Sequence, residues 1–268
     1  MASLMVGVVA YDPKVVLIWE IIRDYAKEKK FDLDYVLFSN YETQVQALLN
    51  KKVDLAWNTN VAWIRTKKSA PFAEALLMRD TDINFTSMFI AHEDSNIHTL
   101  EDIKNKRIGF GSFDSAQAFI LPAYYLKKEG LEPNRDYTMN RVDSDLGKHG
   151  DTGRSEYEIL EKLKNKEYDA IALATSTWMR MIELGLAGSS FRPFYKSSGY
   201  SHCNFTNVTP NASYVNEFVE FMIGMDTKRS DITKMMEMEA LSTWVKTGNE
   251  ELNGYDELEK AMEWLNLF

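Results

Sequence analysis

Cysteine is nearly absent from this sequence, because Cys203 is the only one among 268 residues. A single cysteine excludes an intrachain disulfide, so nothing in the chain requires an oxidising compartment. Basic residues are also scarce, with 31 Lys and Arg against 40 Asp and Glu. The resulting net charge of −9 argues against a nucleic-acid-binding surface, which needs clustered Lys and Arg. An anionic ligand stays compatible with this charge, because hydroxyls, backbone N–H groups and helix N-termini can hold one oxyanion.

Long apolar runs are missing as well. No uncharged run approaches the length of about 18 residues that a membrane-spanning helix needs, so we expect no membrane insertion. The first residues lead directly into the apolar segment 5–9, with no basic segment, long apolar segment or small-residue cleavage site before it. We expect a cytoplasmic protein as the sequence stands, or a periplasmic or cell-surface protein if a signal peptide has been removed.

What the sequence does contain is an alternation of strand and helix patterns. Apolar runs of strand length occur at 5–9, 35–38 and 53–57, and again at 107–110, 137–142 and 169–174. The segments between them carry helical periodicity, such as Val15, Ile18, Trp19 and Ile22 on one face. This order predicts an α/β protein whose sheets are mainly parallel and flanked by helices.

Two extended segments, near 86–92 and 200–207, divide this pattern into two α/β units. We therefore predict two lobes, 1–88 with 205–268 and 89–204, joined by two hinge crossovers. Ligands of such sheets bind beyond the carboxyl ends of the strands. The expected ligand site is a cleft between the lobes.

Several segments occur in an order typical of one known family. They are VDLAWN at 53–58, MFIAHEDS at 88–95, TLEDIK at 99–104, RIGFGS at 107–112 and YDA at 168–170. In this respect the chain resembles the phosphate/phosphite/phosphonate-binding proteins of ABC transporters over most of residues 5–225. The resemblance implies a two-lobed type 2 periplasmic-binding fold, a small oxyanion as ligand and no cofactor. If the protein is exported, it also implies an ABC permease as a partner.

The resemblance also implies binding residues. Ser115 matches the first of a run of hydroxyl residues that hold the oxyanion, His149 matches a histidine of a later loop, and Tyr11 falls where the first lobe supplies an aromatic side chain. The chain departs from the family where the hydroxyl run continues, since it has Ala116, Gln117 and Ala118 there. We keep Gln117 as a candidate ligand contact.

Other candidates follow from the residues themselves. Ser112 and Ser115 flank a strand-to-helix turn, where free N–H groups and the helix dipole favour an anion, although a serine there is often only a cap. His149 lies in a loop with three glycines that allow a close approach to a ligand. Thr152 and Thr175 precede helices, so each is a ligand contact or a cap.

Asn58 and Asn60 bracket a turn after a buried strand, and their amides suit a polar ligand or a turn equally. His202 is the last candidate. Its neighbour Cys203 is expected to be a buried small hydrophobe, and in a regular strand the two side chains would point to opposite faces. The four histidines show no metal-type spacing, so we predict no metal site.

Two other classes of function remain open. One is a cytoplasmic enzyme on the same scaffold, with His149, Asp151 and His202 as acid and base groups. The other is a cytoplasmic ligand sensor that docks a partner.

Overall fold

The computed structural model of this chain describes residues 3–143, 154–248 and 252–268. The chain forms two compact units, of which unit 1 holds Met1–Asn84 and Tyr200–Tyr255, and unit 2 holds Phe85–Gly199 and Asp256–Phe268. Each unit contains one mixed sheet flanked by helices, so the predicted α/β fold class is confirmed. Among the described residues, no helix has the length and apolarity that crossing a membrane demands.

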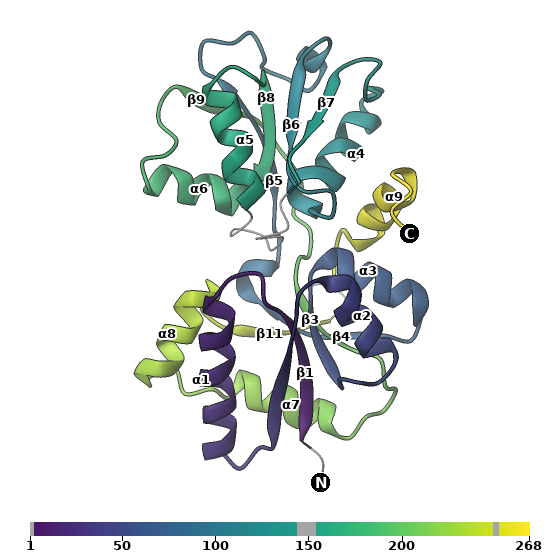
Figure 1. The fold of residues 1–268 in the computed structure, drawn as a ribbon, viewed down its shortest axis with the longest axis vertical. Helices are drawn as coiled ribbons and strands as arrows, with labels where there is room; N and C mark the ends of the chain where they lie inside the picture. Colours follow the sequence, from purple (N-terminus) through teal and green to yellow (C-terminus); the bar gives the residue numbers. More distant parts are fainter. Residues whose placement is uncertain (1–2, 144–153, 249–251) are drawn as a thin grey trace. The chain divides into compact units, whose positions relative to one another are not determined.

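The sheet of unit 1 has the order β11-β4-β10-β3-β1-β2. Its three consecutive parallel strands are β2, β1 and β3, while β10 runs antiparallel between β3 and β4. Figure 1 shows α1 and α8 side by side next to this sheet. The elements are β1 (Leu4–Val9), α1 (Lys14–Glu28), β2 (Leu33–Phe38), α2 (Tyr41–Leu49), β3 (Leu55–Asn58), α3 (Asn60–Ser69), β4 (Glu74–Arg79), η1 (Asp80–Asp82), β10 (Asn204–Asn207), α7 (Tyr214–Ile223), α8 (Ser230–Glu239) and β11 (Trp244–Lys246).

Aromatic side chains fill the core of unit 1. The apolar stripe predicted for α1 is buried, as Trp19 at 2% exposure shows. The ring of Phe205, on the central strand β10, lies 4.6 Å from Trp57 and 5.0 Å from Phe218. These contacts hold β10 against both β3 and α7. They thereby fix the first residue of β10 beside the carboxyl end of β3.

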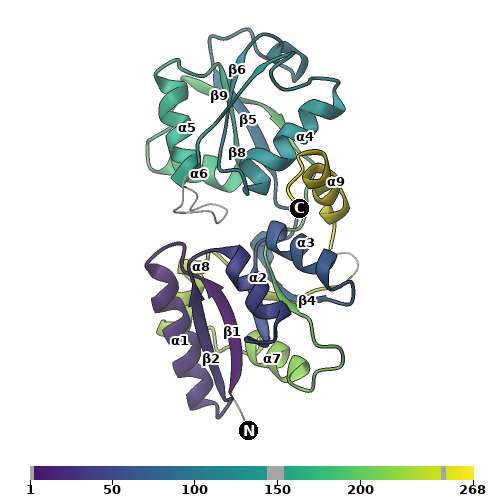
Figure 2. The ribbon, with the colours of Figure 1, turned by 45° about the vertical axis from the view of Figure 1, so that its right-hand side comes forward.

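The sheet of unit 2 has the order β7-β6-β8-β5-β9. Strands β7, β6 and β8 are parallel, and β5 pairs antiparallel with both β8 and β9. In Figure 2, α5 and α6 lie on the opposite side of this sheet from α4. The elements are β5 (Ser87–His92), η2 (Glu101–Ile103), β6 (Arg107–Phe110), η3 (Ala116–Ile120), α4 (Leu121–Lys128), β7 (Thr138–Arg141), α5 (Arg154–Lys164), β8 (Ala170–Ala174), α6 (Thr175–Glu183), β9 (Phe191–Lys196) and α9 (Tyr255–Trp264).

The helix after β6 starts in an unusual way. Residues Ala116–Ile120 form one π-helical turn, and α4 then continues from Leu121 with Pro122 in its first turn. A proline inside a helix normally kinks it or delays its start. A proline is tolerated here because the wider π turn precedes it, so no interior α-helical bond is lost.

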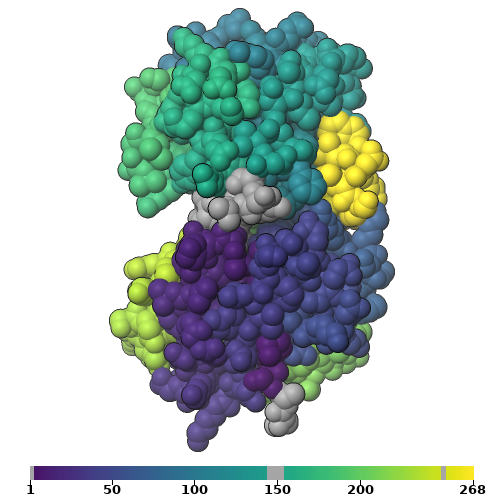
Figure 3. All heavy atoms as spheres, in the orientation of Figure 1, coloured from purple at the N-terminus to yellow at the C-terminus, as the bar shows by residue number. Residues whose placement is uncertain are grey.

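The last helix, α9, groups with unit 2 although the sequence placed 205–268 in the first lobe. Trp264 lies 6.1 Å from the ring of Tyr124 on α4, and the Lys127 ammonium is 4.7 Å from the Trp264 ring. An ion pair joins Lys128 to Glu257. Figure 3 shows α9 in yellow against the teal surface of unit 2. Hydropathy alone gave no sign of this partner, because an amphipathic helix specifies a buried face but not what buries it.

Candidate functional site

The carboxyl ends of the parallel strands of unit 2 bring together residues that are distant in sequence. Strands β6 and β8 are neighbours and end at Phe110 and Ala174. The turns that follow them therefore lie side by side, beyond the carboxyl ends of the strands. We call this set the unit-2 edge, and it consists of Gly111–Gln117, Ser155, Glu156 and Ala174–Thr175.

Ser115 is the N-cap of the helical segment that starts at this edge. Its Oγ accepts a hydrogen bond from the Ala118 amide at 3.1 Å, and the side chain is 4% exposed. A hydroxyl that accepts at a cap keeps its own proton, so it can donate to an oxyanion. The first amides of a helix have no acceptor inside it, and their N–H groups point out of the end that Ser115 caps.

The first turn of α5 holds this edge in place. The Ser112 amide donates to Ser155 Oγ at 3.2 Å, and Gln117 Nε2 donates to Glu156 Oε1 at 3.1 Å. The other oxygen of Glu156 accepts from the Ala174 amide at 2.9 Å. One buried carboxylate thus connects α5 with both strand-to-helix turns.

Glu156 was missed in the sequence, although a signal was present. It stands three, four and seven residues before Ile159, Leu160 and Leu163, all of them buried. A glutamate on the apolar face of a helix is buried by its spacing, and a buried carboxylate needs hydrogen-bond donors.

Gly111 has no room for a side chain. A methyl group there would lie 2.7 Å from Ala118 Cβ and 3.0 Å from Ser155 Oγ. We expect Gly111→Ala to lower the free energy of unfolding by about 1–3 kcal/mol, because the turn and α5 must move apart. Thermal unfolding of this variant checks the effect against Gly188→Ala, where nothing lies within 4 Å of the added methyl. Equal stability of the two variants would show that the contact is not tight.

The remaining candidates of unit 2 have different positions. Ser112 is buried at 2% exposure, and the hydrogen bond from its backbone amide to Ser155 Oγ places it in the turn itself. Thr175 is the first residue of α6, and its Oγ1 lies 2.6 Å from Thr86 Oγ1. The Thr175 side chain makes no capping hydrogen bond to α6, unlike the cap that was one of the two predicted roles. Its hydroxyl therefore remains at the unit-2 edge. His149 and Thr152 lie outside the described residues.

Unit 1 presents a second polar edge. Strands β1, β3 and β4 end here and β10 begins here, because β10 runs antiparallel to β3 and β4. We call this set the unit-1 edge, and it consists of Tyr11, Asn58–Asn60, Arg79–Asp82 and Ser201–Cys203.

Asn58 and Asn60 differ in what they contact. The Asn58 amide is fully buried and bonds to Gln44 and Thr206 at 2.9 Å and to Thr66 at 3.4 Å, so it has a packing role rather than a binding one. Asn60, 1% exposed, donates to the Ser201 carbonyl at 3.4 Å.

Tyr11 follows β1 at 9% exposure, with the Lys14 ammonium 6.0 Å from its ring. Tyr11 and Asn60 therefore remain candidates at the unit-1 edge.

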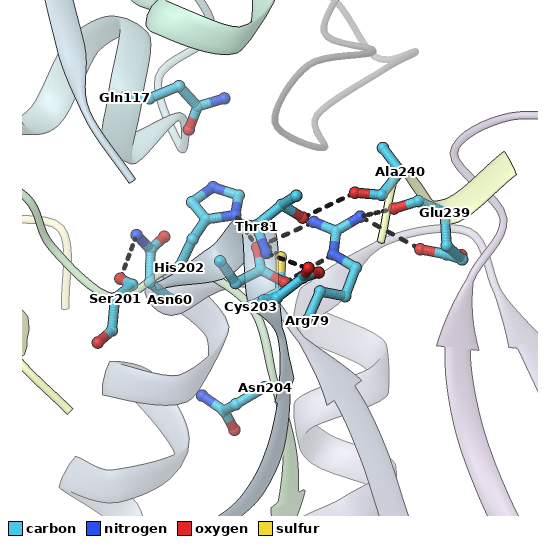
Figure 4. Close-up of polar contacts among 12 residues, drawn as sticks. Asn60, Arg79, Thr81, Gln117, Ser201, His202, Cys203, Asn204, Glu239 and Ala240 are labelled. Atoms are coloured by element: carbon cyan, nitrogen blue, oxygen red, sulfur yellow. Dashed lines mark hydrogen bonds and ion pairs between the residues drawn. The ribbon is translucent and has the colours of Figure 1, made fainter. Parts of the chain in front are cut away.

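A buried charged network occupies the centre of this edge. The Arg79 guanidinium donates to Asp82 through Nε at 2.6 Å and Nη2 at 2.9 Å, and through Nη1 to Glu239 Oε2 at 3.2 Å. Asp82 also faces His202, whose Nδ1 lies 3.1 Å from Oδ1. Figure 4 shows Arg79 between this group and Glu239, with the His202 ring extending beyond it.

The charges of this network stabilise one another. Burial by itself would raise the pKa of the Asp82 carboxyl, but the Arg79 charge and the bonds from Arg79 and His202 lower that pKa well below its ordinary value. Asp82 is therefore an anion that only accepts hydrogen bonds. Its contact with His202 then requires a proton on Nδ1. Because the ring turns Nδ1 toward Asp82, the other nitrogen, Nε2, points away from the network.

His202 and Cys203 approach each other more closely than expected. They precede β10 rather than lying within it, so strand alternation does not separate them, and Cys203 Sγ lies 3.1 Å from His202 Nδ1. Ligand atoms of Asp82, His202 and Cys203 lie within 4.8 Å of one another, a donor set that Zn²⁺ accepts. A cation there would have to compete with the Arg79 guanidinium for Asp82, so the residues fit the ion-paired network better than a metal.

The same geometry does not fit a nucleophilic cysteine. Catalytic relays use the two ring nitrogens separately, one for the nucleophile and one for the acid. Here Cys203 and Asp82 both contact Nδ1, and Cys203 is fully buried. The sequence missed Arg79 and Asp82, which follow the apolar run 75–78.

Comparison with known proteins decides the family. The family described as "ABC transporter, phosphonate, periplasmic substrate-binding protein" matches residues 6–252. The chain belongs to this family. The family predicted from the motifs is thereby confirmed.

One curated relative is distant in sequence. The "Probable ABC transporter phosphite binding protein PhnD1" of Prochlorococcus marinus (strain MIT 9301) is 25% identical over 162 residues, which are 58% of this chain and 52% of that protein. The chain is thus matched to about half the length of this relative.

Solved structures share the fold. The structure of PhnD1 with methylphosphonate matches with a TM-score of 0.75 and 20% identity over 99% of both chains. XAC2383 of Xanthomonas citri bound to ATP matches with a TM-score of 0.77 and 13% identity over 99% of this chain and 98% of that one. At these identities the likeness shows the type 2 periplasmic-binding fold alone.

Proposed function

We propose that this protein is the substrate-binding component of an ABC transporter and binds a small phosphonate-like oxyanion at the unit-2 edge. The observation that carries this proposal is Ser115, whose hydroxyl caps a helical segment and keeps a proton to donate. The first amides of the same segment add donors and the positive end of its dipole. Membership of the phosphonate-binding family supports the same ligand class.

Contacts from other residues belong to the same proposal. Thr175 adds a hydroxyl at the unit-2 edge, and Tyr11, Asn60 and His202 are the candidates of unit 1. The family implies an ABC permease as a partner and a periplasmic location. Of the acid and base groups of the enzyme hypothesis, only His202 lies among the described residues, and its Nδ1 is engaged by Asp82 and Cys203.

Calorimetry tests this function directly. We expect methylphosphonate or phosphite to bind the purified protein with one site per chain, and to raise the temperature of unfolding, since a ligand that binds only the folded state stabilises it. Chloride at the same ionic strength is the control. No heat and no thermal shift with methylphosphonate, phosphite and phosphate would contradict the proposal.

A further inference from the structure

The chain passes between its two units three times. It leaves unit 1 after Asn84, returns at Tyr200 and leaves again after Tyr255, so that α9 belongs to unit 2 from Asp256 onward. A chain that begins and ends in the same unit needs only two such passages. The third passage therefore adds a covalent connection between the units that neither sheet requires.

On unit 1, the segment before the third passage is bonded to the segments beside the other two. The Asn253 amide donates to Ser201 Oγ at 3.0 Å, and the Asn253 carbonyl accepts from the Ser201 amide at 2.9 Å. Asn253 Nδ2 donates to Asn84 Oδ1 at 3.4 Å. Gly254 has a φ of +71°, and a methyl group there would lie 2.5 Å from Tyr200 Cβ. The three passages thus leave unit 1 from one place.

Tyr255 anchors the start of α9 on unit 1. Its hydroxyl donates to the His202 carbonyl at 3.1 Å and accepts from Asn204 Nδ2 at 3.0 Å. Its ring centroid lies 5.9 Å from that of Trp63. The side chain is buried, and this burial raises the pKa of the Tyr255 hydroxyl, so the group keeps the proton that it donates.

The rest of α9 is attached to unit 2. Leu258, Ala261 and Met262 are buried, and the Trp264 ring packs 6.1 Å from that of Tyr124 on α4. The helix has 10 residues, so its two ends lie about 14 Å apart at 1.5 Å per residue. The attachment to unit 1 and the attachment to α4 are therefore separate in space.

We propose that α9 is a strap that limits how far the two units can separate in the ligand-free protein. Its first residue stays bonded to unit 1, while its remaining residues move with unit 2. Such a strap narrows the range of open arrangements and so lowers the conformational entropy that the units lose when they close. The inference goes beyond the proposed function, because it concerns the protein without a ligand.

Pulsed electron paramagnetic resonance between two spin labels measures this range of arrangements. Lys234→Cys on α8 and Glu161→Cys on α5 place one label on each unit, both at exposed positions. The native Cys203 is fully buried, which shields it from the label. The width of the distance distribution and its longest distances report how far the units separate.

Two variants loosen the strap at its two ends. Tyr255→Phe keeps the ring and removes both hydrogen bonds on unit 1, whereas Trp264→Ala removes the contact with Tyr124 on unit 2. Each should broaden the distribution and shift it toward longer distances. The double variant should be no broader than the broader single variant, because a strap acts only while both ends are held. The temperatures of unfolding should instead fall additively, since the two ends are distant.

Two control variants remove similar groups that lie away from the strap. Tyr214→Phe removes a hydroxyl that bonds within unit 1, to the Asp54 carbonyl at 3.4 Å and to Asn207 Oδ1 at 3.3 Å. Phe72→Ala removes an aromatic ring of unit 1 that is 57% exposed. Both should keep the wild-type distance distribution. Circular dichroism establishes that each variant is folded.

A wild-type distance distribution in both folded Tyr255→Phe and folded Trp264→Ala would overturn the inference. So would a broadening that simply adds in the double variant, because the two contacts would then act independently. These distances are measured without a ligand, so absence of methylphosphonate binding would contradict the proposed function alone.

Discussion

Asp82→Asn is expected to destabilise the protein by about 3–5 kcal/mol, because it leaves the buried Arg79 guanidinium without its closest counter-ion. Arg79 is 5% exposed and bonds to Asp82 through two nitrogens, at 2.6 and 2.9 Å. Its second acid, Glu239, contacts only Nη1. Asparagine would also turn a donor toward the donors of Arg79 or His202. Urea unfolding followed by tryptophan fluorescence measures the loss, since Trp57 lies against the guanidinium.

The difference in the free energy of unfolding between the wild type and Asp82→Asn should depend on pH, and the pKa of Asp82 gives the direction. The pKa of Asp82 is lower in the folded protein than in the unfolded chain. Its stabilising contribution is therefore fully present above the unfolded pKa of about 4 and is lost as the pH falls through the folded value. We expect the gap between wild type and Asp82→Asn to be widest near neutral pH and to shrink in acid.

An exposed carboxylate gives the matched control. Asp34 lies 3.8 Å from Arg23 with both side chains exposed, so Asp34→Asn should change the free energy of unfolding by no more than about 1 kcal/mol. A similarly small change for Asp82→Asn would show that the buried network does not stabilise unit 1.

Replacing Ser115 is expected to have the largest effect on ligand binding. Ser115→Ala removes the hydroxyl donor, and a hydrogen bond to a charged group contributes about 1.5–3 kcal/mol, so the affinity for methylphosphonate should fall by about 10- to 100-fold. Ser115→Asp should lower it further, because a carboxylate at this position repels the oxyanion. Calorimetry with methylphosphonate measures both.

The two variants separate binding from capping. Ser115→Ala also loses the bond to the Ala118 amide and with it about 0.5–2 kcal/mol of stability, whereas aspartate still caps. Asn40→Ala removes the cap of α2, where Asn40 accepts from the Thr43 amide at 2.9 Å, and should lower stability without changing affinity. Unchanged affinity in Ser115→Asp would place the oxyanion elsewhere.

Local patterns were enough to place many of the elements. The run at 107–110 coincides with β6, and the face predicted from Val15, Ile18, Trp19 and Ile22 is the buried face of α1, because each segment carries its own periodicity. The strands β4 and β11 and the central antiparallel position of β10 were not recognised. Strand pairing joins segments distant along the chain, so a short strand such as Trp244–Lys246 gives almost no local signal.

The polar groups divide in the same way. Ser115 was recognised by its turn and by family resemblance, and it does cap the helix that follows. Asn58 was recognised by its turn too, but its partners Gln44 and Thr206 come from α2 and β10, and they make it part of the core. Neither a turn motif nor a residue spacing reveals which side chains from distant segments will contact a given residue.

The sequence by itself determined that this chain is an α/β protein of the phosphonate-binding family, and it predicted an anion-holding turn after the strand at 107–110. Each of these depends on periodicity or on residues close together in the chain. Only the tertiary structure decided that Glu156 holds Gln117, that Arg79 and Asp82 stand behind His202, and that α9 packs on α4. Such contacts form only when segments that are distant in the sequence pack against one another. Spacing along the chain therefore does not reveal them.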